Sequence, residues 1–410
     1  MDNPNDLVIV SAVRTPFGRF GGMLKEMHSS TLGAVVCKEV LARANMKGNE
    51  IDEFYYGMCI QSEAALLYNV IGRQVLIHAG LSPDTVSLTI DRACCSSITA
   101  VHLGRKSILL GEANICMAVG AENMSNTPIV LNGHRWGTGL DKPVVVDHLN
   151  PIMYVGFKSI AMDAGEVALE HGISREMQDE WAYHSQMRYQ AAKKQGKFAI
   201  GEELTAVEIP QRKGEALIFE EDEFPKPNTT VEKLATLKTV YGSATVTAGN
   251  APGLDAGASA LIITSRSTAL KNGLQPLGVI LSVGSAAKAP HLMAEVPAYA
   301  IMQALERTNL TVNDLDLIEI NEAFAAVPLV STKLLAKGDP TQWDALKAKT
   351  NPNGGAIAIG HPVGASGARI LMTAMYELRR KGGGVAAVGI CGGLAQGDAV
   401  VIKVDETCLQ

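Results

Sequence analysis

The order of predicted elements in the first third of this 410-residue chain recurs in its last third. Early on, short β-rich runs alternate with helix-like stretches, as in the strand-like residues 6–13 and the helical period of residues 30–46. Later, residues 312–327 and 382–397 repeat the order of strand, glycine-rich or acidic loop, and helix. Such alternation predicts a mostly parallel sheet covered by helices, and its recurrence predicts two similar α/β halves. Because the copies lie far apart, they indicate a duplication and not a solenoid repeat.

The middle of the chain has a different composition. Pro, Gly and charged residues are frequent there, as in EEDEFPKPNTT (220–230), and one helical stretch is clear at 174–196. So long an excursion predicts an inserted loop domain, a lid or a substrate-binding subdomain. The expected division is an N-terminal half of residues 1–122 and 245–270, an inserted domain of residues 123–244 and a C-terminal half of residues 271–410.

Charge and cysteine usage narrow the class of protein. The net charge of −6 argues against a general nucleic-acid binder, although helix N-termini could still hold an anionic small molecule. No apolar run reaches the length that spans a bilayer, so we expect no membrane association. The seven cysteines show no CxxC spacing. The first residues resemble neither a signal nor a transit peptide, and a cytoplasmic protein with reduced thiols is expected.

A cysteine doublet, Cys94 and Cys95, lies between the strand-like residues 86–90 and a helix expected over 97–112. The positive end of that helix would favour a thiolate and lower the pKa of a thiol placed at the turn. Alternatively, both cysteines are small buried hydrophobes, which most free cysteines are. Taken alone, the doublet favours the packing interpretation.

Three further segments carry residue types that catalyse reactions. His361 lies within the glycine-rich NPNGGAIAIGHPVGASGAR (351–369), and Cys391 precedes two glycines that could direct N–H groups at an oxyanion. In EINEAFA (319–325), Asn321 could cap a helix or hold a catalytic water, and Glu322 could be a first-turn acid. Neither a dinucleotide fingerprint nor a P-loop is present, which argues against a nicotinamide oxidoreductase.

These segments resemble the thiolase family, and the resemblance covers essentially the whole chain. GHPVGASGAR and NEAFA are highly specific when they occur together, and SAVRTPFGRFGG (11–22) and TVTAGNAPGLDAGASALI (245–262) agree. The resemblance implies a five-layer α/β/α/β/α sandwich of two duplicated βαβαβαββ halves with an inserted loop domain. It also implies a homodimer or tetramer that binds acyl-CoA and CoA, with CoA as co-substrate and no metal or organic cofactor.

The resemblance assigns catalytic roles by position. Cys94 matches the acyl-accepting nucleophile, His361 the histidine that activates it, and Cys391 the acid/base cysteine. Asn321 matches the residue that holds a water in a first oxyanion hole, which His361 completes. The backbone N–H groups of Gly393 and Cys94 match the second oxyanion hole. Cys95 falls on a variable position.

Departures from the family pattern concern the substrate. A histidine position of short-chain thiolases holds Ala161, and Pro252 replaces a serine that contacts pantetheine, so that hydroxyl is lost. The final glycine run reads CGGLAQG where the family has CxGGGxG. The residues expected to bind substrate are Met162, Ala248, Gly249, Pro252 and Phe324.

These departures favour a degradative thiolase that cleaves a larger β-ketoacyl-CoA, branched or aromatic. They are similar to the benzoylsuccinyl-CoA thiolases of anaerobic toluene breakdown, which implies a small zinc-containing OB-fold partner. The alternatives are a biosynthetic acetyl-CoA acetyltransferase that condenses two acetyl-CoA and a non-catalytic thiolase-like binding protein. A decarboxylating ketoacyl synthase shares the fold, but Asn321 in NEAF beside GHPVGASGAR favours a thiolase.

Overall fold

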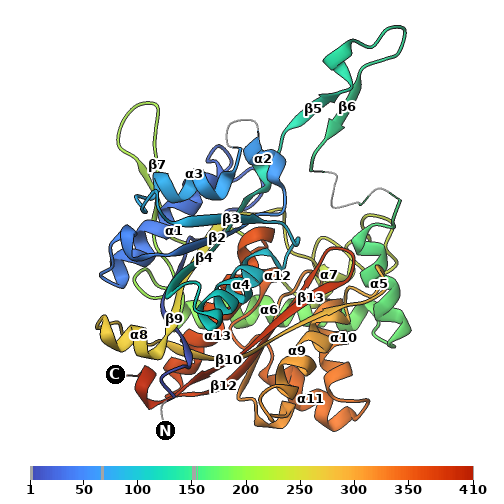
Figure 1. The fold of residues 1–410 in the computed structure, drawn as a ribbon. Coiled ribbons are helices and arrows are strands. Elements are labelled where there is room, and N and C mark those ends of the chain that lie inside the picture. The colour runs from blue at the N-terminus through green and yellow to red at the C-terminus, as the bar shows by residue number, and fades with distance from the viewer. Residues whose placement is uncertain (1–2, 66–68, 150–153, 155, 410) are drawn as a thin grey trace.

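A computed structural model describes residues 3–65, 69–149, 154 and 156–409 (Figure 1). Within these residues, nine strands form one mixed sheet in the order β11-β12-β13-β10-β1-β9-β4-β2-β3. The strands are β1 (Leu7–Arg14), β2 (Glu53–Gly57), β3 (Val86–Ile90), β4 (Ile115–Asn123), β9 (Ala256–Ser265), β10 (Gly278–Ala287), β11 (Leu317–Ile320), β12 (Gly384–Gly392) and β13 (Gln396–Val404).

The pairing pattern confirms the predicted duplication. In the N-terminal half, β1, β9 and β4 pair antiparallel, and β4, β2 and β3 pair parallel. In the C-terminal half, β10, β13 and β12 repeat the antiparallel order, and β12 and β11 pair parallel. In the first half, β2 also pairs with the edge strand β3. The corresponding pairing in the second half is reduced, among the described residues, to one parallel bridge between Ile318 of β11 and Thr350.

Helices pack between the two halves of the sheet and on their outer sides. The middle layer contains α4 (Ser96–Leu110) and α13 (Ser366–Arg380), which contact each other and strands of both halves. Helices α1 (Ser29–Arg43) and α3 (Ile71–His78) pack on the N-terminal strands, and α9 (Val296–Glu306) packs on the C-terminal strands. The halves are also joined through a short pairing of Leu7–Ile9 with residues 278–280, so their strands form one continuous sheet.

Other elements surround this core. The remaining α-helices of the described ranges are α2 (Gln61–Ala65), α5 (Ile160–Glu170), α6 (Arg175–Lys194), α7 (Val231–Ala235), α8 (Arg266–Lys271), α10 (Ala326–Leu335), α11 (Pro340–Lys349) and α12 (Ala356–Ile359). Two hairpins, β5 (Ile129–Asn132) with β6 (Val144–Asp147) and β7 (Val207–Ile209) with β8 (Leu217–Phe219), lie between β4 and β9. No helix within the described ranges has both the length and the apolar character that crossing a membrane requires.

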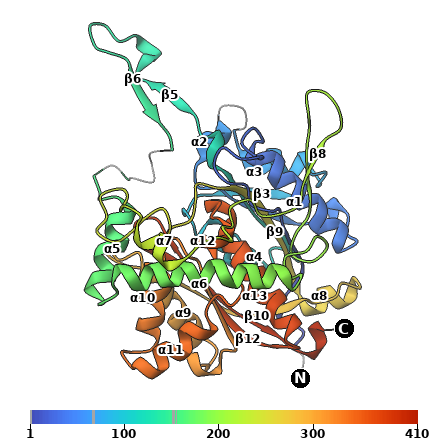
Figure 2. The same ribbon diagram turned by 180° about the vertical axis from the view of Figure 1, so that it is seen from behind.

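The strands described between β4 and β9 do not belong to the nine-stranded sheet. The predicted helix over 174–196 is α6, whose N-cap Ser174 accepts a hydrogen bond from the Met177 N–H. Figure 2 shows α6 crossing the side of the molecule that faces away from the viewer in Figure 1. Figure 1 shows the β5–β6 hairpin projecting away from the body.

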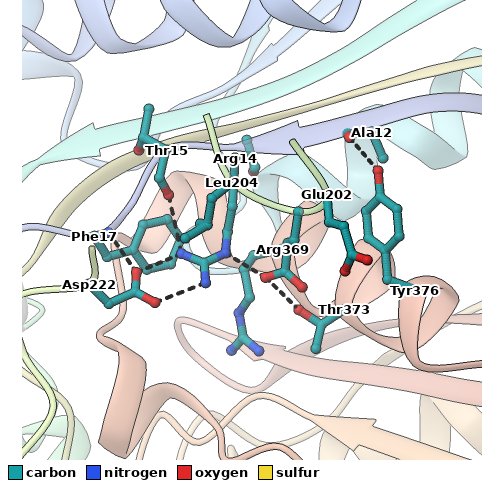
Figure 3. Close-up of polar contacts among 12 residues, drawn as sticks. Ala12, Arg14, Thr15, Phe17, Glu202, Leu204, Asp222, Arg369, Thr373 and Tyr376 are labelled. Atoms are coloured by element: carbon teal, nitrogen blue, oxygen red, sulfur yellow. Dashed lines mark hydrogen bonds and ion pairs between the residues drawn. The ribbon is translucent and has the colours of Figure 1, made fainter. Parts of the chain in front are cut away.

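A buried ion-pair cluster fastens this segment to the sheet. Arg14, the last residue of β1, is fully buried, and its guanidinium contacts Glu203 at 2.5 Å and Asp222 at 2.6 Å. Asp222 also accepts the Phe17 N–H at 2.8 Å, and Glu203 accepts the Thr373 hydroxyl at 3.1 Å (Figure 3). Three segments far apart in the sequence therefore meet at one charged group.

Candidate active site

The cysteine doublet lies where β3 ends and α4 begins. Ala93 has a left-handed φ of 49°, which is uncommon for a residue other than glycine. Cys95 is the N-cap of α4 and is fully buried, and its sulfur lies 2.9 Å from the place where a Cβ on Gly392 would be. Cys94 instead lines a cavity of about 460 Å³. The structure thus brings only the first cysteine of the doublet to the cavity.

The thiol of Cys94 does not have the lowered pKa that its place beside α4 predicted. Burial raises the pKa of Cys94 well above its ordinary value, and the nearby Cys391 raises it further. The prediction fails because the field at a helix N-terminus amounts to about half a unit charge, whereas burial removes most of the hydration that a thiolate needs. Cys94 is therefore a neutral thiol, which needs a base before it can act as a nucleophile.

His361 is placed to be that base. Its Nε2 lies 3.2 Å from the Cys94 sulfur, and its backbone N–H donates to Asp255 at 2.7 Å. Gly360, just before it, has a φ of 111°, a backbone conformation that side chains rarely permit. Burial and, to a smaller extent, the charge of Arg369 lower the pKa of His361 to about 3. The imidazole is neutral at pH 7 and can accept a proton.

Ser366 determines which imidazole nitrogen carries the proton. The Ser366 hydroxyl donates to the Pro362 carbonyl at 2.9 Å, so its oxygen is left to accept from His361 Nδ1 at 2.6 Å. This arrangement places the proton on Nδ1 and leaves Nε2 with a free lone pair directed at Cys94. Ser366 is thus a positioning residue that sequence reasoning missed, because a serine at the start of a helix carries no distinctive signal.

We expect Ser366→Ala to lower kcat on the order of 100-fold, less than the roughly 10⁴-fold loss when a catalytic histidine takes the wrong tautomer. The His361 ring would lose its only fixed Nδ1 partner, whereas Ser366→Thr keeps a hydroxyl and should retain most activity. Ser282→Ala is the matched control, because the buried Ser282 hydroxyl also donates to a carbonyl, that of Ala304 at 2.7 Å. Equal kcat values for Ser366→Ala and the control would contradict this role.

The predicted water-holding residue, Asn321, lies beside the histidine. Its Nδ2 is 3.4 Å from His361 Nε2, and its backbone N–H donates to the Gly389 carbonyl at 3.0 Å. Its side-chain oxygen is buried without a hydrogen-bond partner among the described residues. Such a buried acceptor is suited to an ordered water. The side-chain oxygen of Asn321 can therefore accept a hydrogen bond from the water that the predicted role requires.

Glu322, in contrast, does not act as a first-turn acid, because helix α10 begins only at Ala326. Its carboxylate is fully buried and accepts hydrogen bonds at 2.7–3.1 Å from the donors Trp181 Nε1, Ser185 Oγ, Asn351 Nδ2 and the Ile357 N–H. These contacts fix the segment that carries Asn321. No local pattern predicts these contacts, since the donors lie at least 29 residues away.

Cys391 lies at the end of β12 and is fully buried. Burial raises the pKa of its thiol to about 12, so Cys391 carries its proton at neutral pH. A negative charge on Cys391 would raise the pKa of the Cys94 thiol, so the two groups interact electrostatically. A neutral thiol beside the nucleophile can give a proton and later take one back.

The turn after Cys391 has the left-handed backbone conformation that glycine favours, although two of its residues are not glycine. Gly393 lines the cavity, and Leu394 and Ala395 follow it with φ angles of 56° and 55°. Glycine adopts this left-handed region freely, while other residues lose roughly 1–2 kcal/mol each. Leu394 and Ala395 therefore adopt backbone angles typical of glycine, which lowers the stability of the fold.

The cavity gathers six of the residues predicted for the site and leaves others outside. Those that line it are Cys94, His361, Gly393, Ala248, Pro252 and Phe324. Met162 and Gly249 do not line it: the Met162 sulfur lies against Gly242, and Gly249 lies against Leu234 and Leu237. Sequence reasoning missed further lining residues, among them Tyr154, Phe224, Lys226, Tyr241 and Met293. These belong to irregular segments whose composition gives no periodic signal.

The described residues contain no group of three or more His, Cys, Asp or Glu side chains arranged to hold a metal ion. Lys226 is the one Lys or Arg among the described lining residues, and its ammonium lies 4.4 Å from the centre of the Phe224 ring. Most of the other lining side chains are apolar. The site therefore combines two thiols, a neutral histidine and a mostly apolar cavity that Lys226 and Asp147 both line.

Comparisons with known proteins agree with this geometry. The family description "Thiolase, N-terminal domain" matches residues 7–267, and "Thiolase, C-terminal domain" matches residues 274–404. An acetyl-CoA acetyltransferase of Cupriavidus necator is 41% identical over 404 residues, which cover 97% of this chain and 99% of that protein. A beta-ketoadipyl-CoA thiolase of Acinetobacter baylyi is 38% identical, over 96% of this chain and 98% of that protein.

Solved structures give the same result. The crystal structure of the Bacillus anthracis acetyl-CoA acetyltransferase has a TM-score of 0.90 and 35% identity, and the match covers 97% of this chain and 98% of that chain. Human mitochondrial 3-ketoacyl-CoA thiolase in complex with CoA has a TM-score of 0.88 and 35% identity, covering 98% of each chain.

Proposed function

This chain belongs to the thiolase family of acyltransferases, and on that premise we propose that it cleaves a β-ketoacyl-CoA with a bulky acyl group, using CoA. The observation that carries the proposal is the 3.2 Å contact between Cys94 and a His361 ring whose free lone pair faces the thiol. A neutral base next to a neutral thiol can form a thiolate at the moment of attack, without a stable ion pair.

In the proposed cleavage, His361 Nε2 takes the proton of Cys94, and the thiolate attacks the 3-keto carbon. The Cα–Cβ bond then breaks, leaving the acyl group on Cys94, and the departing acyl-CoA enolate takes the proton of Cys391. That enolate is stabilised by His361 and by a water held on Asn321. CoA next gives its thiol proton to Cys391 and attacks the acyl thioester, which releases the acyl-CoA, and the proton on His361 returns to Cys94.

The cavity supports a bulky acyl group. Its volume of about 460 Å³ is within the range of sites that hold a drug-sized ligand, and its lining includes the aromatic side chains of Tyr154, Phe224, Tyr241 and Phe324. Ala161 lines it where short-chain thiolases carry a histidine. Pro252, which replaces the serine of the family pattern, also lines the cavity and favours altered contacts with CoA. The positively charged Lys226 could pair with an anionic group of the substrate. Benzoylsuccinyl-CoA is our specific candidate.

Condensation of two acetyl-CoA is the second candidate, because two of the similar proteins named above are acetyl-CoA acetyltransferases. The same residues would serve the reverse reaction. The candidates differ in the acyl group that the cavity accepts best, and substrate preference therefore separates them.

We expect kcat/KM for benzoylsuccinyl-CoA and β-ketoadipyl-CoA to exceed that for acetoacetyl-CoA. Ala161→Phe should fill the cavity and lower kcat/KM for the bulky substrates by roughly 10–200-fold, while acetoacetyl-CoA cleavage changes little. Ala248→Ser, a small change in the same lining, is the control. Strong preference for acetoacetyl-CoA would contradict the bulky substrate, and absence of thiolysis across the panel would contradict the thiolase activity itself.

Assembly is part of the proposal. We propose a homodimer or tetramer, supported by Val86 and Leu88 on the outer edge strand β3, which are 66% and 49% exposed. Trp136 on the projecting hairpin is 91% exposed. The resemblance to benzoylsuccinyl-CoA thiolases adds a small zinc-containing OB-fold partner. Light scattering of the purified protein, and the substrate panel repeated with co-purified proteins, distinguish these assemblies.

A further inference from the structure

The hydroxyl of Tyr154 lies directly against Gly393. A Cβ built on Gly393 would be 1.7 Å from the Tyr154 oxygen and 2.5 Å from the ring carbon that bears it. No side chain fits in that space, so glycine at 393 and tyrosine at 154 depend on each other. The backbone N–H assigned to the second oxyanion hole therefore has a phenol as its immediate neighbour.

Tyr154 also shares a cavity with the proposed nucleophile. Tyr154 lines the cavity with Cys94 and Gly393. Burial, and the nearby Cys94 and other acidic groups, raise the pKa of Tyr154, which keeps the phenol protonated at neutral pH. No hydrogen bond from this hydroxyl to another described residue is found, and Tyr154 is half-buried at the cavity. The phenol can therefore donate to a ligand held there.

We propose that Tyr154 is a catalytic residue, the third donor of the oxyanion hole formed by the backbone N–H groups of Gly393 and Cys94. The inference rests on the proposed thiolase function and goes beyond the roles that the family resemblance assigns. The Tyr154 hydroxyl donates to the carbonyl oxygen that becomes negatively charged when Cys94, and later CoA, attacks the acyl carbon. No bond to Tyr154 forms or breaks, and the phenol keeps its proton throughout.

Tyr154→Phe tests the proposal, because it removes only the hydroxyl. We expect kcat to fall on the order of 100-fold with little change in KM, which is the usual result of removing one oxyanion-hole donor. Tyr376→Phe is the matched control, since the Tyr376 hydroxyl donates to the Ala12 carbonyl at 2.8 Å and Tyr376 does not line the cavity. Its kcat should stay within about 2-fold of the unmodified protein.

A spectroscopic measurement separates hydrogen bonding from altered packing. The infrared carbonyl band of Cys94 acylated with carbon-13-labelled acetyl-CoA should move to higher frequency in Tyr154→Phe and stay unchanged in Tyr376→Phe. An unchanged band, or an unchanged kcat in Tyr154→Phe, would overturn the proposal. If the unmodified protein forms no acyl-cysteine, the proposed function fails instead, so the two failures are distinguishable.

Discussion

Replacing Cys94 with serine should abolish thiolysis, with kcat at least about 10⁴-fold lower, because the serine hydroxyl is far less acidic than a thiol and neutral His361 cannot deprotonate it effectively. Replacing Cys95 with serine should leave kcat within about 10-fold, since Cys95 is buried against Gly392 and away from the cavity. Steady-state kinetics with one β-ketoacyl-CoA would measure both effects.

Cys95→Ser is the control for Cys94→Ser. Cys94 and Cys95 are adjacent and differ mainly in direction, one toward the cavity and the other toward the β12 strand. Equal losses would mean that serine at either position disturbs the turn at Ala93. A full loss with Cys95→Ser and activity with Cys94→Ser would mean that the nucleophile has been assigned to the wrong cysteine.

Arg14→Met should lower the free energy of unfolding by about 3–5 kcal/mol, the usual cost of removing one partner of a buried ion pair. Glu203 and Asp222 would remain buried without their compensating charge (Figure 3). Arg14→Lys keeps the charge but loses the paired contacts to two carboxylates, and an intermediate loss is expected. Urea unfolding followed by circular dichroism would measure the series.

The exposed pair of Arg19 and Glu223 offers the control. Arg19 has a side chain that is 58% exposed, and Arg19→Met should change the free energy of unfolding by at most about 1 kcal/mol. A similarly small effect of Arg14→Met would contradict the view that the Arg14 cluster fastens the inserted segment to the sheet.

Local patterns predicted most of the fold. The strand-like residues 6–13 and the helical residues 174–196 have clear periodicity, and the structure has β1 and α6 there within two residues at each end. The halves were expected from repeated element order, and strand pairing bears that out. The bridge between β1 and β10 was not expected, because pairing of only three residues has no sequence signature.

The site was predictable only in part. Family motifs indicated Cys94 and His361, and the structure brings them within 3.2 Å. The direction of the Cys94 pKa shift was wrong because burial depends on segments that lie 267 residues away, and no local pattern encodes it. Tyr154 was missed for the same reason, since its proposed role comes from a contact with the distant Gly393. Ser366 lies only five residues from His361 and was missed because a serine at the start of a helix carries no distinctive signal.

The most direct test of the central claim is to locate the acyl group in the trapped intermediate. The protein is mixed with excess acetyl-CoA, quenched in acid to preserve thioesters, digested and sequenced by mass spectrometry. The account predicts one acetyl group per chain, on Cys94, with Cys95 and Cys391 unmodified, and no acetylation of Cys94→Ser. An acetyl group on Cys95 or Cys391, or no covalent adduct in the unmodified protein, would contradict it.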